Sequence, residues 1–372
     1  MDVYNFSAGP SCLPQSVLKQ AQSELRNWHN TGISVMEMSP REAEFISIAN
    51  QAKLTLRHLL NIPDNYHILY LQGGARSQFA MVPLNLLGKN PKANYLISGL
   101  WGEIACEEAR RYGDINEVPI LSKESPYHFT EPSTWLIDPN ATYTHVTTNE
   151  TINGNENYSL PQLLPNQCIV ADMSSTLLSR PFDVTEYDLI YACAQKNMGP
   201  SGVTFVIVRN DILWNKMDYT PAMFNYQNHI EQDSLYNTAP TFSLYIAGLV
   251  FEWLKNQGGL SAMAEQNKRQ ADQLYQYIDQ SDFYSNNVSK SARSWMNVPF
   301  LLADKSKENE FLEQAKKAGL IGLKGHRFVG GMRASIYNAM PDEGIAKLLE
   351  FMEHYKNKQK QNGDNVRAST QI

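Results

Sequence analysis

The sequence predicts an α/β fold in which a mostly parallel sheet is covered by helices on both faces. Short apolar runs that suit buried strands alternate with stretches of helical periodicity through the first two thirds of the chain. Strands buried on both faces read as such continuous runs, and their alternation with helices is typical of parallel sheets. The last third changes character, and 372 residues are enough for a second domain.

Periodicity places the elements of the first two thirds. A helix is expected over 15–30, because apolar residues recur near helical spacing at Val17, Leu18, Ala21, Leu25 and Trp28. A further helix is expected from about Ser77, after a tight glycine turn. Strands are expected at 67–71, 94–97, 144–147, 168–171, 189–193 and 203–208.

The last third reads as a smaller α/β domain that begins after Gly258-Gly259. Helices are expected at 261–278, 308–318 and 344–355, and strands at 295–301 and 334–337. We therefore expect a large domain over 15–257, a small domain built from 1–14 and 258–355, and a tail over 356–372. The tail is rich in Lys, Gln and Asn and has almost no apolar periodicity, so we expect it to be disordered.

The composition argues against several classes of function. A formal net charge of -6 disfavours nucleic acid as the main partner, although a local basic pocket for a small anion remains compatible with it. No run approaches the roughly 20 apolar residues of a membrane span, and we expect no secretory signal, no membrane association and a cytoplasmic location. The four cysteines lack CxxC spacing and suit reduced core thiols, and no His/Cys spacing suggests a metal site.

Two charged residues follow predicted strands, at the edge of the sheet where α/β proteins bind their ligands. Asp172 follows the strand at 168–171, and Lys196 follows the strand at 189–193. One interpretation is a structural ion pair. The other is that the lysine forms a Schiff base with a carbonyl cofactor while the carboxylate keeps a pyridine nitrogen protonated. Position alone leaves both open.

The glycine turn at 73–77 lies between a predicted strand and a predicted helix, so its backbone N–H groups could cradle a phosphate. Many such turns are only connections. This one lacks the ending of a P-loop, and the chain has no GxSxG motif, so a small phosphorylated cofactor suits the turn better than ATP or NAD. Trp101 follows another strand end, where its ring could stack on a flat cofactor or simply belong to the core.

A basic cluster lies in the predicted small domain. It comprises Lys324-Gly325-His326-Arg327 and, beyond Gly330-Gly331, Arg333. Paired arginines suit bidentate binding of carboxylate and phosphate groups, and flanking glycines allow a ligand to approach closely. The alternative is an ordinary solvated surface.

Taken together, these segments resemble the phosphoserine aminotransferases, which are class-V enzymes of pyridoxal-phosphate-dependent fold type I. The resemblance covers nearly the whole chain and stops only in the polar tail. The motifs that carry it are Phe6-Ser7-Ala8-Gly9-Pro10, Gly73-Gly74-Ala75-Arg76, Asn149-Glu150-Thr151-Ile152, Asp172-Met173-Ser174-Ser175, Ala194-Gln195-Lys196-Asn197, Asn237-Thr238-Ala239-Pro240-Thr241-Phe242, Lys324-Gly325-His326-Arg327 and Arg333-Ala334-Ser335-Ile336-Tyr337-Asn338-Ala339.

The resemblance implies a seven-stranded, mostly parallel sheet in the large domain and pyridoxal 5'-phosphate as the cofactor. Lys196 would be the Schiff-base lysine and the proton shuttle, Asp172 would pair with the pyridine nitrogen, and Trp101 would stack on the ring. The implied cofactor-binding residues are Ala75, Arg76, Trp101, Thr151, Asp172, Gln195, Lys196, Asn237 and Thr238.

The resemblance also implies a homodimer, because Asn237 and Thr238 would reach the cofactor phosphate of the neighbouring subunit. Arg333 would clamp the substrate α-carboxylate, while Arg41, His326 and Arg327 would hold the distal phosphate or carboxylate. The implied reaction exchanges an amino group between glutamate/2-oxoglutarate and 3-phosphohydroxypyruvate/O-phospho-L-serine in serine biosynthesis. A second implied activity forms 4-phosphohydroxy-L-threonine in pyridoxine biosynthesis.

The chain departs from the family pattern beside Arg41. The family usually has Ser-His-Arg where this chain has Ser39-Pro40-Arg41, so one imidazole donor to the distal anion is lost. Proline also fixes the local backbone. Because charge-assisted hydrogen bonds contribute about 1.5–3 kcal/mol, substrate affinity could change by roughly one or two powers of ten.

Rival interpretations stay open at this point. Other fold-type I activities include a cysteine desulfurase, which needs a mobile nucleophilic cysteine, and a serine–glyoxylate aminotransferase. A binding or regulatory protein that keeps the fold without turnover is a different class, and the presence of both Asp172 and Lys196 disfavours it.

Overall fold

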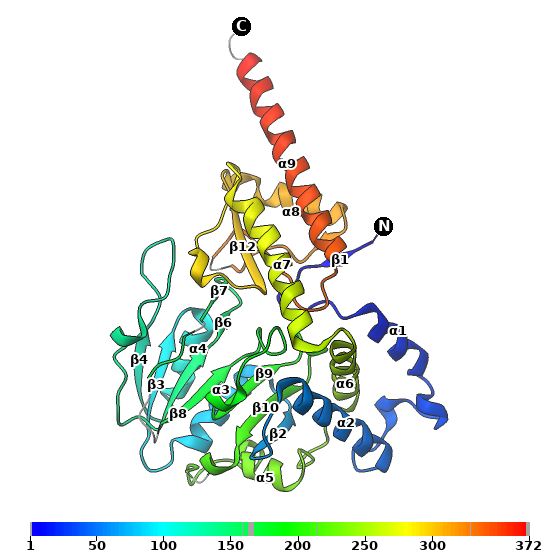
Figure 1. Ribbon diagram of the computed structural model, residues 1–372, viewed down its shortest axis with the longest axis vertical. Coiled ribbons are helices and arrows are strands. Elements are labelled where there is room, and N and C mark those ends of the chain that lie inside the picture. The colour runs from blue at the N-terminus through cyan, green and yellow to red at the C-terminus, as the bar shows by residue number, and fades with distance from the viewer. Residues whose placement is uncertain (1, 158, 163–166, 214, 328, 370–372) are drawn as a thin grey trace.

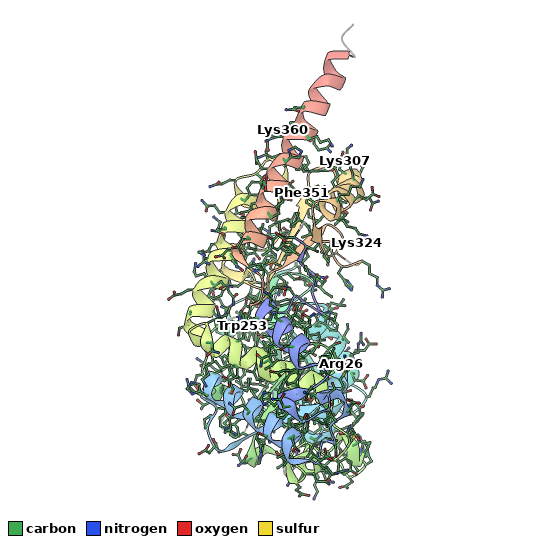
Figure 2. The ribbon with its side chains drawn as sticks, turned by 90° about the vertical axis from the view of Figure 1, so that its right-hand side faces the viewer. Arg26, Trp253, Lys307, Lys324, Phe351 and Lys360 are labelled. Carbon is green, nitrogen blue, oxygen red and sulfur yellow. The ribbon has the colours of Figure 1, made fainter. Side chains whose placement is uncertain are left out.

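The structure is a computed structural model that describes residues 2–157, 159–162, 167–213, 215–327 and 329–369. A seven-stranded sheet with helices on both faces forms one part, and a smaller group of helices and strands lies at one end of it (Figure 1). Figure 2 labels Arg26 and Trp253 in the first part and Lys324 and Phe351 in the second.

The seven strands lie in the order β2-β10-β9-β8-β5-β3-β4. Only β10 runs antiparallel to its neighbours, so the expected mostly parallel seven-stranded sheet is confirmed. The bounds are β2 Tyr66–Leu71, β3 Lys92–Ile97, β4 Asp114–Pro119, β5 Tyr143–Thr147, β8 Cys168–Asp172, β9 Leu189–Cys193 and β10 Thr204–Arg209.

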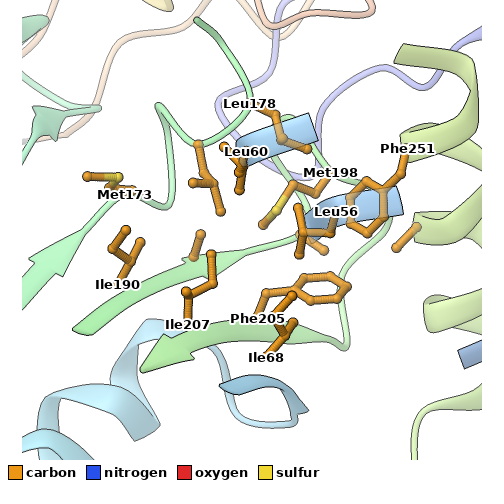
Figure 3. Packing of buried hydrophobic residues seen from close by; sticks show 14 of the residues in the cluster. Leu56, Leu60, Ile68, Met173, Leu178, Ile190, Met198, Phe205, Ile207 and Phe251 are labelled. Carbon is orange, nitrogen blue, oxygen red and sulfur yellow. The ribbon is translucent and has the colours of Figure 1, made fainter. Parts of the chain in front are cut away.

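Side chains alternate between the two faces of the sheet, and each face has its own hydrophobic core. On one face Ile68 and Phe205 pack against Leu56 of α2 (Ala43–Leu60) and Phe251 of α6 (Thr241–Asn256), as Figure 3 shows. The other face, which includes Tyr191, is covered by α3 (Gly74–Leu86) and α4 (Leu100–Ala109). Burial on both faces explains why these strands read as continuous apolar runs.

Strand β4 was not predicted, and the first helix is shorter than predicted. β4 lies at the edge of the sheet, so its sequence Asp-Ile-Asn-Glu-Val-Pro is half exposed and lacks an apolar run. The helix expected over 15–30 ends at Glu24 as α1 (Gln15–Glu24), and a separate 3₁₀ helix covers Trp28–Asn30. His29 and Asn30 have left-handed backbones, with φ of 45° and 64°, which an α-helix cannot accommodate.

The second part contains a three-stranded antiparallel sheet, β11-β12-β14, flanked by helices. Strand β1 near the N-terminus pairs with β13 here, and Phe6 lies in the same core, which supports our proposed assignment of 1–14 and 258–355 to one domain. The strands of this part are β1 Tyr4–Asn5, β11 Tyr284–Ser285, β12 Asn297–Leu302, β13 Leu320–Ile321 and β14 Met332–Ser335. Its helices are α7 Gly259–Asp279, α8 Glu308–Lys317 and α9 Asp342–Ser369. The short helix α5 (Tyr226–Glu231) belongs to the first part.

The expected disordered tail is helical as far as the structure describes it, because α9 continues to Ser369. Its first turns beyond 355 are held by polar contacts to the rest of the small domain. Lys360 Nζ donates to Asp282 Oδ2 at 2.7 Å, and Gln359 Nε2 donates to Glu310 Oε1 at 3.0 Å. Lys and Gln are good helix formers, so an anchored helix can extend without an apolar face. None of the described helices combines the length and the apolar character needed to cross a membrane.

Candidate active site

A cavity of about 250 Å³ lies at the carboxyl ends of β5, β8 and β9, beside the start of α3. Seven of the nine cofactor-binding residues expected from the sequence line it: Ala75, Arg76, Trp101, Thr151, Asp172, Gln195 and Lys196. A larger open hollow of about 710 Å³ lies at the opposite ends of β5 and β8, near Tyr143 and Cys168, and contains none of the expected residues.

The turn before α3 has the shape of a phosphate cradle. Gly73 and Gly74 have φ of 98° and 67°, conformations that favour glycine, and α3 begins directly after Gly73. A Cβ atom at Gly73 would lie 1.9 Å from Ser77 Oγ, so the turn also lacks space for a side chain. The first N–H groups of a helix need acceptors from outside it, and here they border the cavity.

Lys196 reaches the cavity from the segment after β9. Its Nζ donates a hydrogen bond to Thr151 Oγ1 at 2.6 Å. The N-terminal segment fixes the backbone around Lys196. Ser11 N donates to the carbonyl of Gln195 at 2.9 Å, and Ser11 Oγ donates to the carbonyl of Lys196 at 2.5 Å. These contacts give the N-terminal Phe6–Pro10 motif and its neighbours a structural purpose that the sequence did not reveal.

Asp172 is the last residue of β8 and is only 6% exposed. Burial raises the pKa of its carboxyl group, and hydrogen bonds from Ser174 together with the charge of Lys196 oppose that rise. The Ser174 N–H donates to Asp172 Oδ1 at 2.8 Å. Asp172 and Lys196 therefore face one cavity, as expected, but without a direct ion pair among the described contacts.

Trp101 is held by a carboxylate that the sequence did not single out. Glu150 accepts the backbone N–H of Trp101 at 2.9 Å and that of Gly102 at 2.8 Å, so it caps the start of α4. Glu150 is fully buried, and this burial raises the pKa of its carboxyl group to about 7. The Arg76 guanidinium lies 6.0 Å from the centre of the Trp101 ring. Glu150 stands inside the Asn149–Ile152 motif, which was the available signal.

Several polar atoms of the cavity walls lack partners and would suit a polar, flat ligand. Trp101 Nε1, Thr147 Oγ1 and Asn149 Oδ1 are buried and have no hydrogen-bond partner among the described residues. Such atoms are costly unless something satisfies them. Together with the cradle and Lys196, they fit a ring that carries a carbonyl, a pyridine nitrogen and a phosphate.

Arg333, on β14, does not line the cavity itself but contacts Thr151, which does. It is 8% exposed, and its Nη1 donates to the carbonyl of Thr151 at 3.2 Å. Burial lowers the pKa of its guanidinium, and its Nε has no partner within the described part of the chain. A buried arginine with an unused donor is suited to bind a carboxylate.

Six expected residues do not line the cavity in the described structure, namely Arg41, Asn237, Thr238, His326, Arg327 and Arg333. Arg41 is exposed, and its N–H donates to Ser39 Oγ at 3.4 Å. Burial, and then the charges of Arg333 and Arg327, lower the pKa of His326, so these three side chains face a common region.

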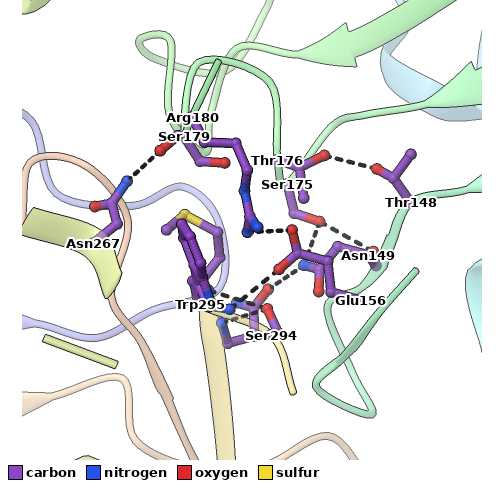
Figure 4. Close-up of polar contacts among 12 residues, drawn as sticks. Thr148, Asn149, Glu156, Ser175, Thr176, Ser179, Arg180, Asn267, Ser294 and Trp295 are labelled. Carbon is purple, nitrogen blue, oxygen red and sulfur yellow. Dashed lines mark hydrogen bonds and ion pairs between the residues drawn. The ribbon is translucent and has the colours of Figure 1, made fainter. Parts of the chain in front are cut away.

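Buried polar contacts join the cavity to the small domain (Figure 4). Asn149 Nδ2 donates to Asn297 Oδ1 of β12 at 2.8 Å. The Arg180 guanidinium lies 3.6 Å from the centre of the Trp295 ring and pairs with Glu156, which also accepts the Trp295 N–H at 3.2 Å. Because β12 pairs with β14, these contacts fix the strand that carries Arg333 relative to the cavity that Lys196 lines.

Comparison with known proteins agrees with this site. The family model for class-V aminotransferases matches residues 3–348. A phosphoserine aminotransferase of Nitrosomonas europaea is 51% identical over 362 residues, which are 95% of this chain and 98% of that protein.

Solved structures of phosphoserine aminotransferases have the same fold. That of Bacillus circulans subsp. alkalophilus has a TM-score of 0.91 with 41% identity and covers 96% of this chain and 99% of its own. The pyridoxal-phosphate-bound enzyme of Trichomonas vaginalis has a TM-score of 0.89 with 36% identity and covers 94% and 99%. The fold, the cavity and these likenesses together show that this chain belongs to the class-V aminotransferases, among the phosphoserine aminotransferases.

Proposed function

We propose that this protein uses pyridoxal 5'-phosphate to exchange an amino group between glutamate/2-oxoglutarate and 3-phosphohydroxypyruvate/O-phospho-L-serine. The observation that carries the proposal is one cavity in which Lys196, Asp172 and the glycine cradle at Gly73-Gly74 come together. When bound, pyridoxal phosphate supplies a carbonyl carbon to which amines attach and a ring that withdraws electrons. The family membership of the chain and its 51% identity to a phosphoserine aminotransferase support this choice of reaction.

The position of each residue in the cavity suggests its role. The N–H groups of Ala75 and Arg76, at the start of α3, would hold the phosphate, and Asp172 would accept a hydrogen bond from the ring nitrogen. Lys196 Nζ would hold the cofactor before substrate binds and, once displaced, move the proton at the substrate Cα. Thr151 lies 2.6 Å from Nζ and can orient this amine.

Substrate anions would be bound mainly from the small domain. Arg333 has one unused, buried donor, its Nε, for the α-carboxylate. We assign the distal phosphate to Arg41, His326 and Arg327, of which the latter two share a positive region with Arg333. Since Pro40 replaces the family histidine, this phosphate would depend more on the two arginines. The 4-carbon phosphorylated analogue of pyridoxine biosynthesis would use the same groups.

We further propose a homodimer in which Asn237 and Thr238 bind the cofactor phosphate of the partner subunit. Neither residue lines the cavity of its own chain in the described structure, and Asn237 Nδ2 instead donates to Gln72 Oε1 at 2.5 Å. Gln72 directly precedes the Gly73-Gly74 cradle, so this pair stands beside the phosphate region at the surface. We place the enzyme in the cytoplasm, where four free thiols would stay reduced.

A cysteine desulfurase is disfavoured by the state of the cysteines. Burial raises the pKa of Cys12 and Cys106 to about 11 and that of Cys168 to about 12, and it also raises the pKa of Cys193. A nucleophilic cysteine needs the opposite, a lowered pKa and an accessible position.

The overall reaction tests the proposal. Purified protein loaded with pyridoxal phosphate should convert glutamate and 3-phosphohydroxypyruvate to 2-oxoglutarate and phosphoserine, and should release no sulfide from cysteine. Lys196→Ala should lose this turnover together with the visible absorbance of lysine-bound cofactor, because the attachment point is gone. Normal turnover by Lys196→Ala, or sulfide release by the wild type, would contradict the proposal.

A further inference from the structure

We propose that Tyr191 and His145 form a hydrogen-bond relay behind Asp172 that fixes the orientation of its carboxylate, and that both are positioning residues for the cofactor. The inference rests on the proposed use of Asp172 as the partner of the cofactor ring nitrogen. It deepens that role by adding two buried residues that lie outside the set lining the described cavity.

The sheet brings these three side chains to the same face. Asp172 pairs in register with Tyr191 on the neighbouring strand β9 and with Thr147 on the other neighbour, β5. His145 precedes Thr147 by two residues, so its side chain points to the same side of the sheet. That side carries the α3–α4 core, which contains Tyr191 and Tyr143, and the cavity, which Thr147 and Asp172 line.

His145 contacts Tyr191 directly and is held rigidly. Its Nε2 lies 2.8 Å from the Tyr191 hydroxyl oxygen. The ring of Tyr95 stacks on the imidazole with centroids 4.7 Å apart and planes 14° from parallel. His145 is 1% exposed and Tyr191 is fully buried, so water does not compete for their hydrogen bonds.

Burial fixes how the protons are arranged. It lowers the pKa of His145 to about 3, so the imidazole is neutral near pH 7 and carries one N–H. Its Nδ1 has no partner among the described residues. A proton on Nδ1 would leave a buried donor without an acceptor. Tyr191 would then have to donate its hydroxyl proton to Nε2. We therefore assign the imidazole proton to Nε2, which donates to the Tyr191 oxygen.

The Tyr191 proton is then directed to Asp172. Tyr191 lies directly beside Asp172 in the strand register, on the same face of the sheet. The interactions that lower the pKa of Asp172 are hydrogen bonds from Ser174, the charge of Lys196 and, as the smallest of them, a hydrogen bond with Tyr191. These oppose the desolvation that would otherwise favour a neutral carboxyl group. Glu150 and Cys193 also interact electrostatically with Asp172, and neither one donates to it in the described structure. The relay thus runs from His145 through Tyr191 to the carboxylate.

The relay predicts that Tyr191→Phe binds the cofactor more weakly, as measured by titrating the protein with pyridoxal phosphate. A hydrogen bond to a charged group contributes about a tenfold or larger change in binding, so we expect the dissociation constant of the cofactor to rise at least about tenfold. The acid limb of the pH dependence of cofactor binding should also move to higher pH, because Asp172 loses a donor that favours its ionised form. A purely structural role would not move this limb.

Tyr143→Phe is the matched control. Tyr143 is equally buried on β5, two strands away from Tyr191, and its hydroxyl pairs with that of Tyr95 at 2.9 Å rather than contacting Asp172. Cofactor affinity in this variant should stay within about twofold of the wild type. Equal affinities and equal pH profiles for Tyr191→Phe and Tyr143→Phe would overturn the relay.

His145 gives a second test that does not depend on Tyr191→Phe folding. The side-chain amide of Gln can place a donor near the position of Nε2, so His145→Gln should retain most cofactor affinity, whereas His145→Leu should lose it about as Tyr191→Phe does. Equal affinities of the Gln and Leu variants would overturn the relay. Failure of the wild type to aminate 3-phosphohydroxypyruvate would instead contradict the proposed function, and these binding measurements would still decide on the relay.

Discussion

Lys196, which is partly buried, and the buried Asp172 and Glu150 form one group of charges at the carboxyl ends of the parallel strands. The charge of Asp172 helps to raise the pKa of Glu150, and that of Lys196 helps to lower it, although burial is the largest cause of the shift. Glu150 also fixes the start of α4 and with it Trp101. The ionisation of Glu150 therefore depends on the charges of Asp172 and Lys196.

Glu150→Gln should change the pH dependence of stability in the cofactor-free protein. The folded-state pKa of Glu150 is raised to about 7, so between its usual value and pH 7 the folded state holds a proton that the unfolded state has lost. Glu150 therefore makes the wild type progressively less stable as the pH rises through this window, by at most about 1.4 kcal/mol per pH unit. Glutamine has no such dependence.

Urea unfolding at pH 5 and pH 8 measures this difference. The free energy of unfolding of Glu150→Gln relative to wild type should rise by roughly 2 kcal/mol between the two pH values. Any constant loss from the weakened cap cancels in this comparison. The exposed Glu313 provides the control, since Glu313→Gln should show no comparable trend. A stability difference between Glu150→Gln and wild type that is independent of pH would contradict the assignment.

At the scale of elements, the active site depends on the segment that comes directly after each strand. β2 leads into the glycine cradle and α3, β3 leads toward Trp101 and α4, and β8 ends at Asp172. Because the carboxyl ends of parallel strands meet at one edge, residues distant in the sequence converge there. The cradle has a restricted conformation, because both Gly73 and Gly74 have a positive φ.

Gly73→Ala should weaken cofactor binding more than it weakens the fold. Its φ of 98° strains any side chain, and the new Cβ would collide with Ser77, so the turn must move. We expect a loss of about 1–2 kcal/mol in stability and at least about a tenfold weaker affinity for pyridoxal phosphate, measured by absorbance titration.

Gly32 provides the matched control for the cradle. Its φ is 86°, but nothing lies within 4 Å of a Cβ built there. Gly32→Ala should therefore lose similar stability with unchanged cofactor affinity. Comparable loss of cofactor affinity in both variants would show that Gly73 acts only through global stability.

Strand-end residues could be predicted from the sequence, because an apolar run followed by a charged residue has a defined place in an α/β fold. Asp172 and Lys196 were found in this way. Glu150, Tyr191 and His145 could not, since a buried polar residue has no periodic signal and its partners are set by strand order. β4 was missed because its edge position leaves it without an apolar run. Periodicity also does not detect the non-helical backbone of Asn27, His29 and Asn30, which prevents the first helix from continuing to residue 30.

At the scale of the whole molecule, the proposed substrate site draws on both proposed domains. Lys196 and Asp172 come from the large domain and Arg333 from the small one, and the contacts of Arg180, Glu156 and Trp295 hold these parts together (Figure 4). The distal residues Arg41, His326 and Arg327 lie outside the cavity of the described single chain. A second subunit that completes the site would explain why Asn237 and Thr238 also lie outside it.

Hybrid dimers test this sharing of sites. One parent carries Lys196→Ala, and the other carries Asn237→Ala with Thr238→Ala. In a shared dimer the site that retains Lys196 receives intact Asn237 and Thr238 from its partner, so mixing two weakly active parents should restore activity. With random pairing, about a quarter of wild-type activity is expected, because half of the dimers are hybrids with one intact site. Activity equal to the mean of the parents, with subunit exchange confirmed, would contradict shared sites.

The half-reaction with one substrate tests the central claim most directly. O-phospho-L-serine is added to the protein loaded with pyridoxal phosphate, the visible absorbance of the lysine-bound cofactor is followed, and L-serine serves as the control. We predict that phosphoserine abolishes this absorbance and that L-serine at the same concentration leaves it nearly unchanged, since only phosphoserine carries the distal anion for Arg41, His326 and Arg327. A response to glutamate but not to phosphoserine, or an equal response to serine, would contradict phosphoserine as the substrate.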